Sequence, residues 1–310
     1  MPPAARMRSF GASFGTTNSP LKRYTSLTVD DETAKLRYYE LEFAKISLCK
    51  VIAMLLATIP LGWRLMIYLL AGIGAGIANG IAGGGTFVTF PTLLATGAAA
   101  LTANVTTTVG VVPSYLGGIR GFRFQLRGHR DLVRSLVPSC VLGTAAGCSL
   151  LLLGSPHLFA LVVPWLIGTG TLLFALAPLI TKRLAHVDHA HPARRWGLFI
   201  GIFVVAIYGG YFGAGMGILL LAVMALSLPF EIQELQGLRS VLSLIINVIA
   251  ALIFVVRGHL IVDAVYMFLI GTLVGGWLGA MLILRLSPNV VRIVIIVVGL
   301  VTTIRLAIAA

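Results

Sequence analysis

Gly80-Ile81-Ala82-Gly83-Gly84-Gly85-Thr86 recurs in degenerate form as Gly210-Tyr211-Phe212-Gly213-Ala214-Gly215-Met216, 130 residues further along the chain. The same offset places Arg127-Gly128-His129 on Arg257-Gly258-His259. Two ungapped matches at one offset indicate that the chain contains two copies of one unit. The glycine clusters therefore predict a duplicated fold, with a special backbone conformation at the same place in each copy.

The composition of the chain is that of a membrane protein. Its 310 residues are 58% hydrophobic and only 11% charged, and the mean hydropathy is +0.99, whereas soluble domains are close to half apolar. The formal net charge of +13 does not indicate a nucleic-acid partner, because the basic residues cluster in short loops between apolar runs. That distribution is typical of the cytoplasmic loops of membrane proteins.

The apolar runs predict an all-α, polytopic integral membrane protein with two inverted repeats of about four to five transmembrane or half-membrane helices each. Residues 86–97 and 214–227 are short and follow the glycine clusters directly, so we expect half-length helices behind unwound breaks. Pro91 and Pro113 are expected to interrupt helices. The runs that approach the ~20 residues needed to cross a bilayer are 64–82, 101–122, 132–153, 158–181, 196–212, 233–256, 261–284 and 289–309.

The charge of the loops sets the expected orientation. Arginines crowd residues 120–134 and basic residues recur at 182–195, so both loops are expected in the cytoplasm. The equivalent loop of the second unit, at Arg257, then lies outside, which makes the units antiparallel. The expected divisions are a polar cytoplasmic tail (1–50), a short apolar segment that is interfacial or an extra span (51–62), the first repeat (63–181), a cytoplasmic linker (182–195) and the second repeat (196–310).

The two glycine clusters are the strongest candidates for a binding site. A helix that begins inside the membrane presents free N–H groups and a partial positive charge, which together favour an anion. Paired, glycine-broken segments at matching positions are also typical of secondary transporters. The alternative is close helix packing, which we favour for Gly72 and Gly76. The candidate substrate-binding residues at the breaks are Gly83, Gly84, Gly85, Thr86, Gly213, Gly215 and Met216.

Arg239 is the basic residue that lies well inside a predicted span. Its burial requires a partner, and a guanidinium can hold two oxygens of a sulfonate or carboxylate. An ion pair with Glu231 or Glu234 is the structural alternative. Asn247 lies on a similar helical face. Asn104 and Thr107 supply neutral polar groups in the first unit that could line a substrate path, although an interhelical hydrogen bond is the favoured explanation for each.

Other polar residues suggest no chemistry. His186, Asp188, His189 and His191 match no structural zinc pattern, so they are interpreted as a polar linker and no metal site is expected. We interpret His129 and His259 as turn residues, and the three cysteines as packing residues. The sequence contains no phosphate-binding loop, HExxH or GxSxG motif, so it predicts neither an enzyme nor a cofactor.

Three stretches resemble a known family in their order and spacing: Gly80–Thr86 with Phe90-Pro91-Thr92-Leu93-Leu94, Asn104-Val105-Thr106-Thr107-Thr108-Val109-Gly110, and Gly210–Gly217. Over about residues 63–308 the chain resembles the sulfite exporter TauE/SafE family of membrane permeases. The segment Leu235–Arg239 followed by Asn247 is similar to members with a basic residue and an asparagine there, whereas Ala214 departs from the glycine pattern.

The resemblance implies a bacterial permease of the cytoplasmic (inner) membrane that moves sulfite, organosulfonates or related sulfur-containing anions. The expected partners are a small anionic substrate and the lipid bilayer, without nucleic acid. Two other functions stay open: a passive anion channel, and a non-transporting membrane subunit that assists a partner. The sequence also leaves the oligomeric state open, a homo-oligomer included.

Overall fold

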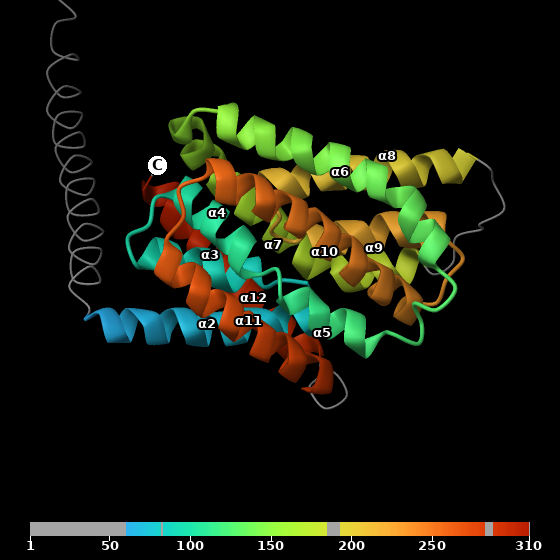
Figure 1. Cartoon of the computed structure of the whole chain (residues 1–310), viewed down its shortest axis with the longest axis horizontal. Helices are drawn as coiled ribbons and strands as arrows, with labels where there is room; N and C mark the ends of the chain where they lie inside the picture. Colours follow the sequence, from blue (N-terminus) through green and yellow to red (C-terminus); the bar gives the residue numbers. More distant parts are fainter. Residues whose placement is uncertain (1–59, 82, 185–192, 283–287, 310) are drawn as a thin grey trace, which may run out of the picture. The chain divides into compact units, whose positions relative to one another are not determined.

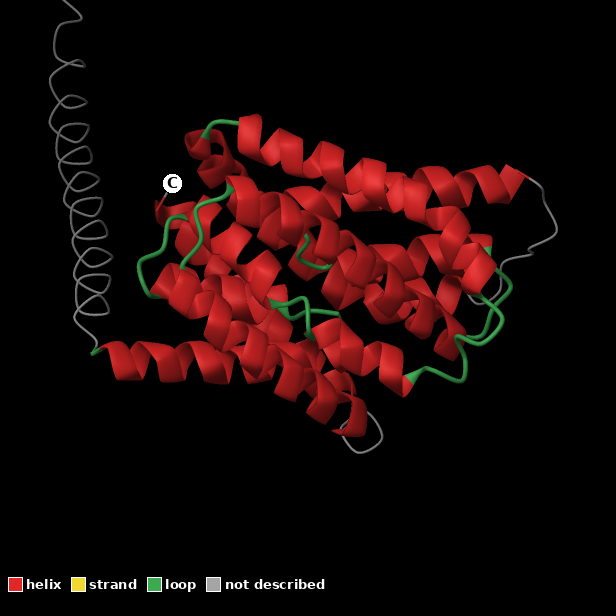
Figure 2. Ribbon diagram, viewed as in Figure 1, coloured by secondary structure: helices red, strands yellow, loops and turns green. Residues whose placement is uncertain are grey.

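The computed structural model of the protein describes residues 60–81, 83–184, 193–282 and 288–309. All of them belong to one compact unit, Cys49–Ala310. Throughout the described residues the regular structure is helical, without a strand (Figure 2). The all-α fold expected from the apolar runs is therefore confirmed.

Eleven helices alternate with short connections in the described part of the chain (Figure 1). The helices of the first half are α2 (Leu61–Ile81), α3 (Thr86–Ala95), α4 (Ala100–Gly110), α5 (Ser114–Gly121), α6 (Arg130–Leu153) and α7 (Pro156–Leu184). Those of the second half are α8 (Ala193–Tyr211), α9 (Met216–Ser227), α10 (Ile232–Arg257), α11 (Val262–Leu282) and α12 (Pro288–Ala309).

The duplication seen in the sequence extends to the helix boundaries. Shifted by 130 residues, α2, α3 and α6 coincide with α8, α9 and α11 to within two residues at either end. The packing repeats as well, because α2 lies against α11 of the other half, and α8 lies against α6 (Figure 1). α7 packs on α12, its own equivalent. This reciprocal exchange is consistent with two inverted repeats.

Glycines allow the helices of the two halves to approach closely. A Cβ atom on Gly72 would lie 3.1 Å from the Cα atom of Gly271, and one on Gly76 would lie 2.5 Å from the backbone nitrogen of Gly276. No side chain larger than hydrogen fits between α2 and α11 at these points. The interpretation of Gly72 and Gly76 as packing residues is confirmed.

The apolar run 101–122 is not one span, as the sequence suggested, but two helices separated at residues 111–113. Pro113 cannot donate a backbone hydrogen bond, and the Ser114 N–H turns back to the carbonyl of Val111. The freed carbonyl of Gly110 accepts a bond of 2.8 Å from the hydroxyl of Thr272 in α11. Pro91, by contrast, lies inside α3 without ending it, so the expected interruption there is wrong.

Five described helices or helix segments are long and apolar enough to cross a membrane: 61–81, 130–153, 156–176, 232–257 and 262–279. Shorter apolar helices include α3 and α9, the two half-length helices expected behind the breaks. The protein is therefore a multi-pass membrane protein. The sequence left open whether the segment 51–62 crosses the membrane. Residues 51–59 of this segment lie outside the described residues.

Candidate functional site

Two interruptions of the helical backbone lie at equivalent positions in the two halves. The first comprises Gly83–Gly85, between α2 and α3, and the second Phe212–Gly215, between α8 and α9. Gly83 has φ of 78°, and Gly213 and Gly215 both have φ of 77°. These are left-handed conformations that side chains with a Cβ atom adopt only at a cost. The glycine clusters are thus explained by local geometry.

The structure brings the two interruptions into contact. A Cβ atom placed on Gly217, in the first turn of α9, would lie 3.4 Å from the Cα atom of Gly83 and 3.6 Å from its carbonyl oxygen. The backbones approach this closely because neither position carries a side chain. The beginning of one half-length helix therefore adjoins the break of the other half.

Arg239 of α10 lies directly against this junction. A Cβ atom on Gly83 would lie 3.1 Å from Arg239 Nη1, and one on Gly217 would lie 3.5 Å from Arg239 Cδ. The arginine is only 4% exposed. Among the described residues no carboxylate forms an ion pair with it. An isolated buried charge costs several kcal/mol, which keeps Arg239 a candidate anion-binding residue.

A cluster of buried amides and hydroxyls adjoins the arginine. Asn247 Nδ2 donates to the Tyr115 hydroxyl at 3.2 Å and to the Ser243 carbonyl at 2.9 Å. The Tyr115 hydroxyl interacts electrostatically with Arg239, and Asn79 Nδ2 donates to the hydroxyl of the neighbouring Ser114 at 2.8 Å. The cluster thus joins α2, α5 and α10 around one cation, with neutral groups that can donate or accept hydrogen bonds.

Several N–H groups of the two breaks are already bonded within the chain. Gly85 donates to Asn79 Oδ1 at 2.7 Å, Gly84 to the Ala78 carbonyl at 3.5 Å, and Met216 to the Gly213 carbonyl at 3.2 Å. In this arrangement these groups are not free to hold an anion. The electropositive character of the junction comes from Arg239 more than from exposed N–H groups.

The other side of the breaks is apolar. A Cβ atom on Gly84 would meet the Phe174 ring at 2.8 Å, and one on Gly215 would lie 3.8 Å from Phe87. Phe87 and Phe174 form an edge-to-face pair at 5.7 Å, as do Phe90 and Phe212 at 5.5 Å. The breaks are therefore apolar on the side of Phe87 and Phe174, and they adjoin Arg239 on the side of Gly83 and Gly217.

Asn104 and Thr107 lie one turn apart on α4, beside the second break. Asn104 Nδ2 donates to the Tyr211 carbonyl at 2.9 Å. Its Oδ1 atom and the Thr107 hydroxyl are buried without a hydrogen-bond partner among the described residues. Unpaired buried polar atoms are uncommon, and here two of them occur on adjacent turns of one helix. Thr86, also proposed for the site, is buried at the start of α3.

Comparison with known proteins places this architecture in a family. The family model of the sulfite exporter TauE/SafE matches residues 68–306, which include both breaks and Arg239. The chain belongs to the TauE/SafE family. This confirms the resemblance found in the sequence, and the family name supports a membrane permease.

Relatives of the TauE/SafE chain carry transport names. A "Probable membrane transporter protein" of Haemophilus influenzae is 25% identical over 247 residues, which cover 77% of this chain and 92% of the relative. The "Probable membrane transporter protein YfcA" of Escherichia coli K12 is 24% identical over 236 residues, or 75% and 85% of the two chains. No solved structure matches the chain significantly.

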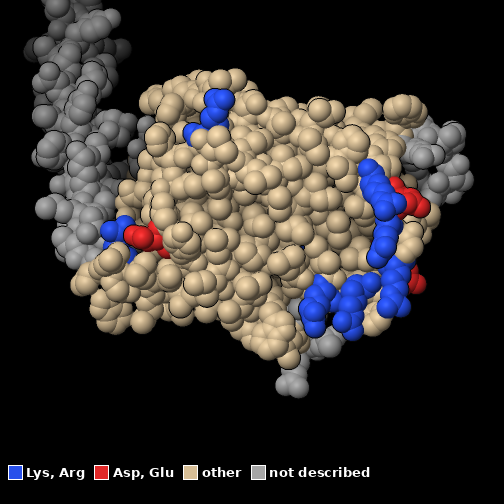
Figure 3. Space-filling model, in the orientation of Figure 1, with Lys and Arg blue, Asp and Glu red and all other residues tan. Residues whose placement is uncertain are grey.

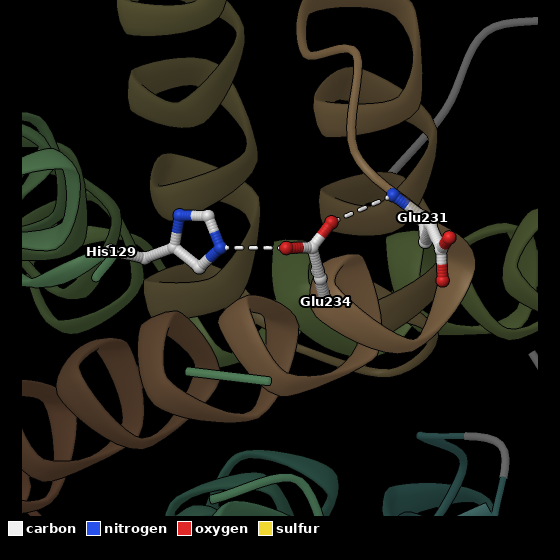
Figure 4. Close-up of polar contacts among 3 residues, drawn as sticks. All are labelled: His129, Glu231 and Glu234. Carbon is white, nitrogen blue, oxygen red and sulfur yellow. Dashed lines mark hydrogen bonds and ion pairs between the residues drawn. The ribbon is translucent and has the colours of Figure 1, made fainter. Parts of the chain in front are cut away.

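A second polar contact joins the halves of this TauE/SafE protein near the start of α10. His129 Nε2 lies 3.0 Å from Glu234 Oε1, and Glu234 Oε2 accepts a bond from the Glu231 N–H at 2.9 Å (Figure 4). The His129 ring also lies 4.5 Å from that of Phe230. The interpretation of His129 as a turn residue therefore missed a long-range contact. Glu234 is engaged here, and not with Arg239.

Two residues of the polar cluster, Asn79 and Tyr115, were not predicted from the sequence. Asn79 was detectable as an isolated amide in an apolar run just before the first glycine cluster, because polar groups inside spans are costly and tend to have a use. Tyr115 gave no such signal, since tyrosine is common near membrane interfaces.

Other expectations concern metals and cysteines. Within the described ranges, no group of three or more His, Cys, Asp or Glu side chains could hold a metal ion. The histidines at 186, 189 and 191, with Asp188, lie outside those ranges. Cys140 and Cys148 are buried free thiols, as expected for packing residues.

Proposed function

We propose that this protein is a secondary permease that carries small oxyanions of sulfur, such as sulfite or an organosulfonate, by alternating access. The observation that carries the proposal is the buried guanidinium of Arg239, which lies on the junction of the two breaks without an acidic partner among the described residues. A substrate anion would supply the missing charge. The family name supports sulfite as the first compound to test.

The residues of the junction suggest how such an anion is held. The planar guanidinium can donate two parallel hydrogen bonds to two oxygens of a sulfite or sulfonate group. The Tyr115 hydroxyl, which interacts electrostatically with Arg239, accepts from Asn247 Nδ2 and can donate its own proton to the anion. Thr107 can donate from its unpaired hydroxyl on the side of α4. Gly83 and Gly217 have no side chains, so they leave room for the anion to approach the guanidinium closely.

The packing of the two halves suggests how access alternates. Each half inserts its first helix against the other half, through α2 with α11 and α8 with α6. Because the site lies where both breaks meet, a rocking of one half relative to the other would expose it to either side in turn. The proposed location is the inner membrane of a bacterium, with the loop at 120–134 in the cytoplasm.

Replacing Arg239 with methionine tests the proposal. Loss of two charge-assisted hydrogen bonds, about 1.5–3 kcal/mol each, predicts a fall in substrate affinity of more than about a hundredfold. Because no acid pairs with Arg239 among the described residues, the folded protein should be as stable or more stable without the charge. A purely structural arginine would instead give an unstable variant. Arg257→Met, at an exposed arginine of the same helix, is the matched control.

The assay is the uptake of radiolabelled sulfite by proteoliposomes that contain the full-length chain. Saturation, together with counterflow driven by unlabelled sulfite inside the vesicles, identifies a carrier. Flux that neither saturates nor shows counterflow identifies the passive channel instead. Normal uptake by a folded Arg239→Met protein would remove Arg239 from the site, and no uptake of any sulfur anion by the wild-type chain would contradict the proposed function.

A further inference from the structure

An open groove lined by basic and apolar side chains lies outside the candidate transport site. It occupies about 440 Å³ between the end of α5, the segment that follows it, the start of α6 and one face of α10. Basic side chains gather along the same edge of the molecule (Figure 3). The lining residues are Ile119, Arg123, Leu126, Arg127, His129, Arg130, Val133, Arg134 and Val241.

The charges of the groove are concentrated and largely unneutralised. No acidic residue is among its described lining residues, although the lining residue His129 contacts Glu234 at 3.0 Å. Arg134 pairs with Asp131 at 3.4 Å, but both side chains are highly exposed, so that pair contributes little. Arg123 and Arg127 both lie over the ring of Phe124, at 4.6 and 5.0 Å from its centre. The ring therefore holds two like charges near each other, which an anion bound between them would relieve.

The groove also has an apolar interior. Ile119, Leu126, Val133 and Val241 come from four different segments and line the same space as the arginines. Val241 lies more than two turns inside α10, whereas the arginines lie at helix ends and in the connecting segment. Apolar lining residues thus lie both among the arginines and, at Val241, further along α10.

We infer that this groove binds the phosphate headgroup of an anionic phospholipid, with the upper part of an acyl chain against its apolar wall. A free phosphate would make the same ionic contacts as the headgroup, but it has no apolar part that could contact the four apolar lining residues. Basic pockets between membrane helices are suited to such headgroups.

The groove is distinct from the route to Arg239. Val241 and Arg239 are two residues apart on α10, so they project from it about 200° apart. The segment between α5 and α6 packs closely on α10: a Cβ atom on Gly237 of α10 would lie 3.1 Å from both Leu126 and Phe122. A lipid bound in the groove would therefore hold the α5–α6 segment on α10, two residues before the transport arginine.

Native mass spectrometry of the full-length protein, with added phosphatidylglycerol or phosphatidylcholine, tests this inference. The wild type should retain phosphatidylglycerol preferentially. Each arginine replaced by glutamine should weaken its binding about fivefold, so R127Q/R130Q should lose about 25-fold. Arg127→Lys with Arg130→Lys should keep most of the binding, because the charge remains. R257Q is the matched control, since Arg257 is the equivalent of Arg127 in the second half.

Several outcomes would overturn the inference. Equal retention of the two lipids, or an equal loss in R257Q, would show that the groove does not select the anionic headgroup. Displacement of the lipid by inorganic phosphate or glycerophosphoglycerol at equal affinity would identify a free-phosphate site. If R127Q/R130Q fails to elute as a single species from gel filtration, the salt dependence of wild-type binding decides. Binding that does not weaken as salt rises would contradict a site built on exposed arginines.

Discussion

Replacing Gly83 with alanine adds a single methyl group at the centre of the proposed site. Gly83 has φ of 78°, and a Cβ atom in this conformation costs roughly 1–2 kcal/mol. The methyl carbon would also lie 3.1 Å from Arg239 Nη1 and 3.5 Å from the Gly217 Cα atom. The first contact is too tight, so the guanidinium must move by a few tenths of an ångström.

The displacement should affect transport more than folding. If the shifted guanidinium loses one charge-assisted hydrogen bond to the anion, the cost is about 1.5–3 kcal/mol, or roughly 10- to 150-fold in affinity. The affinity for sulfite in proteoliposome uptake measures this loss. Thermal unfolding of the detergent-solubilised protein measures the backbone strain separately.

Gly97→Ala is the matched control for Gly83→Ala. Gly97 also has a left-handed backbone, with φ of 89°, but a Cβ atom there has nothing within 4 Å. The two variants should lose similar thermal stability, and only Gly83→Ala should lose sulfite affinity. Equal uptake by both variants would refute the proposed role of Gly83 and Arg239 in anion binding. An equal loss of sulfite affinity in both variants would attribute that loss to backbone strain alone.

Two further predictions concern the polar cluster and the helix crossings. Tyr115→Phe removes the acceptor of the Asn247 bond, so the free energy of unfolding should fall by about 1 kcal/mol and sulfite affinity should fall with it; unchanged affinity would place Tyr115 outside the site. Gly117→Ala puts a methyl group onto the carbonyl oxygen of Gly276, whereas Gly62→Ala meets nothing within 4 Å. Overpacking should lower the free energy of unfolding of Gly117→Ala by about 3 kcal/mol and leave that of Gly62→Ala unchanged. A fluorescence melting assay measures both variants. Equal melting temperatures would contradict the tight contact of α5 with α11.

Local features of the sequence were sufficient for most of the architecture. Hydropathy predicted the helices, and the 130-residue offset predicted which of them are equivalent, because chain length and apolarity are properties of a segment by itself. The glycine clusters predicted the two breaks for the same reason, since left-handed backbone conformations favour glycine wherever they occur. The division of the run 101–122 was missed, although Pro113 marked its position, because the break also depends on Thr272 of α11 to satisfy the Gly110 carbonyl.

The candidate site shows where local reasoning ends. Arg239 was found because a charge inside a span is costly wherever its partners lie. Its neighbours were decided only by the tertiary structure: Gly83 and Gly217 meet from different halves, Asn79 takes the Gly85 N–H, and Glu234 pairs with His129, 105 residues away. The sequence determined by itself that two helices break inside a membrane and that a cation is buried among them. Only the packing of distant segments decided which groups remain unpaired, because a hydrogen bond depends on positions in space that no single segment encodes.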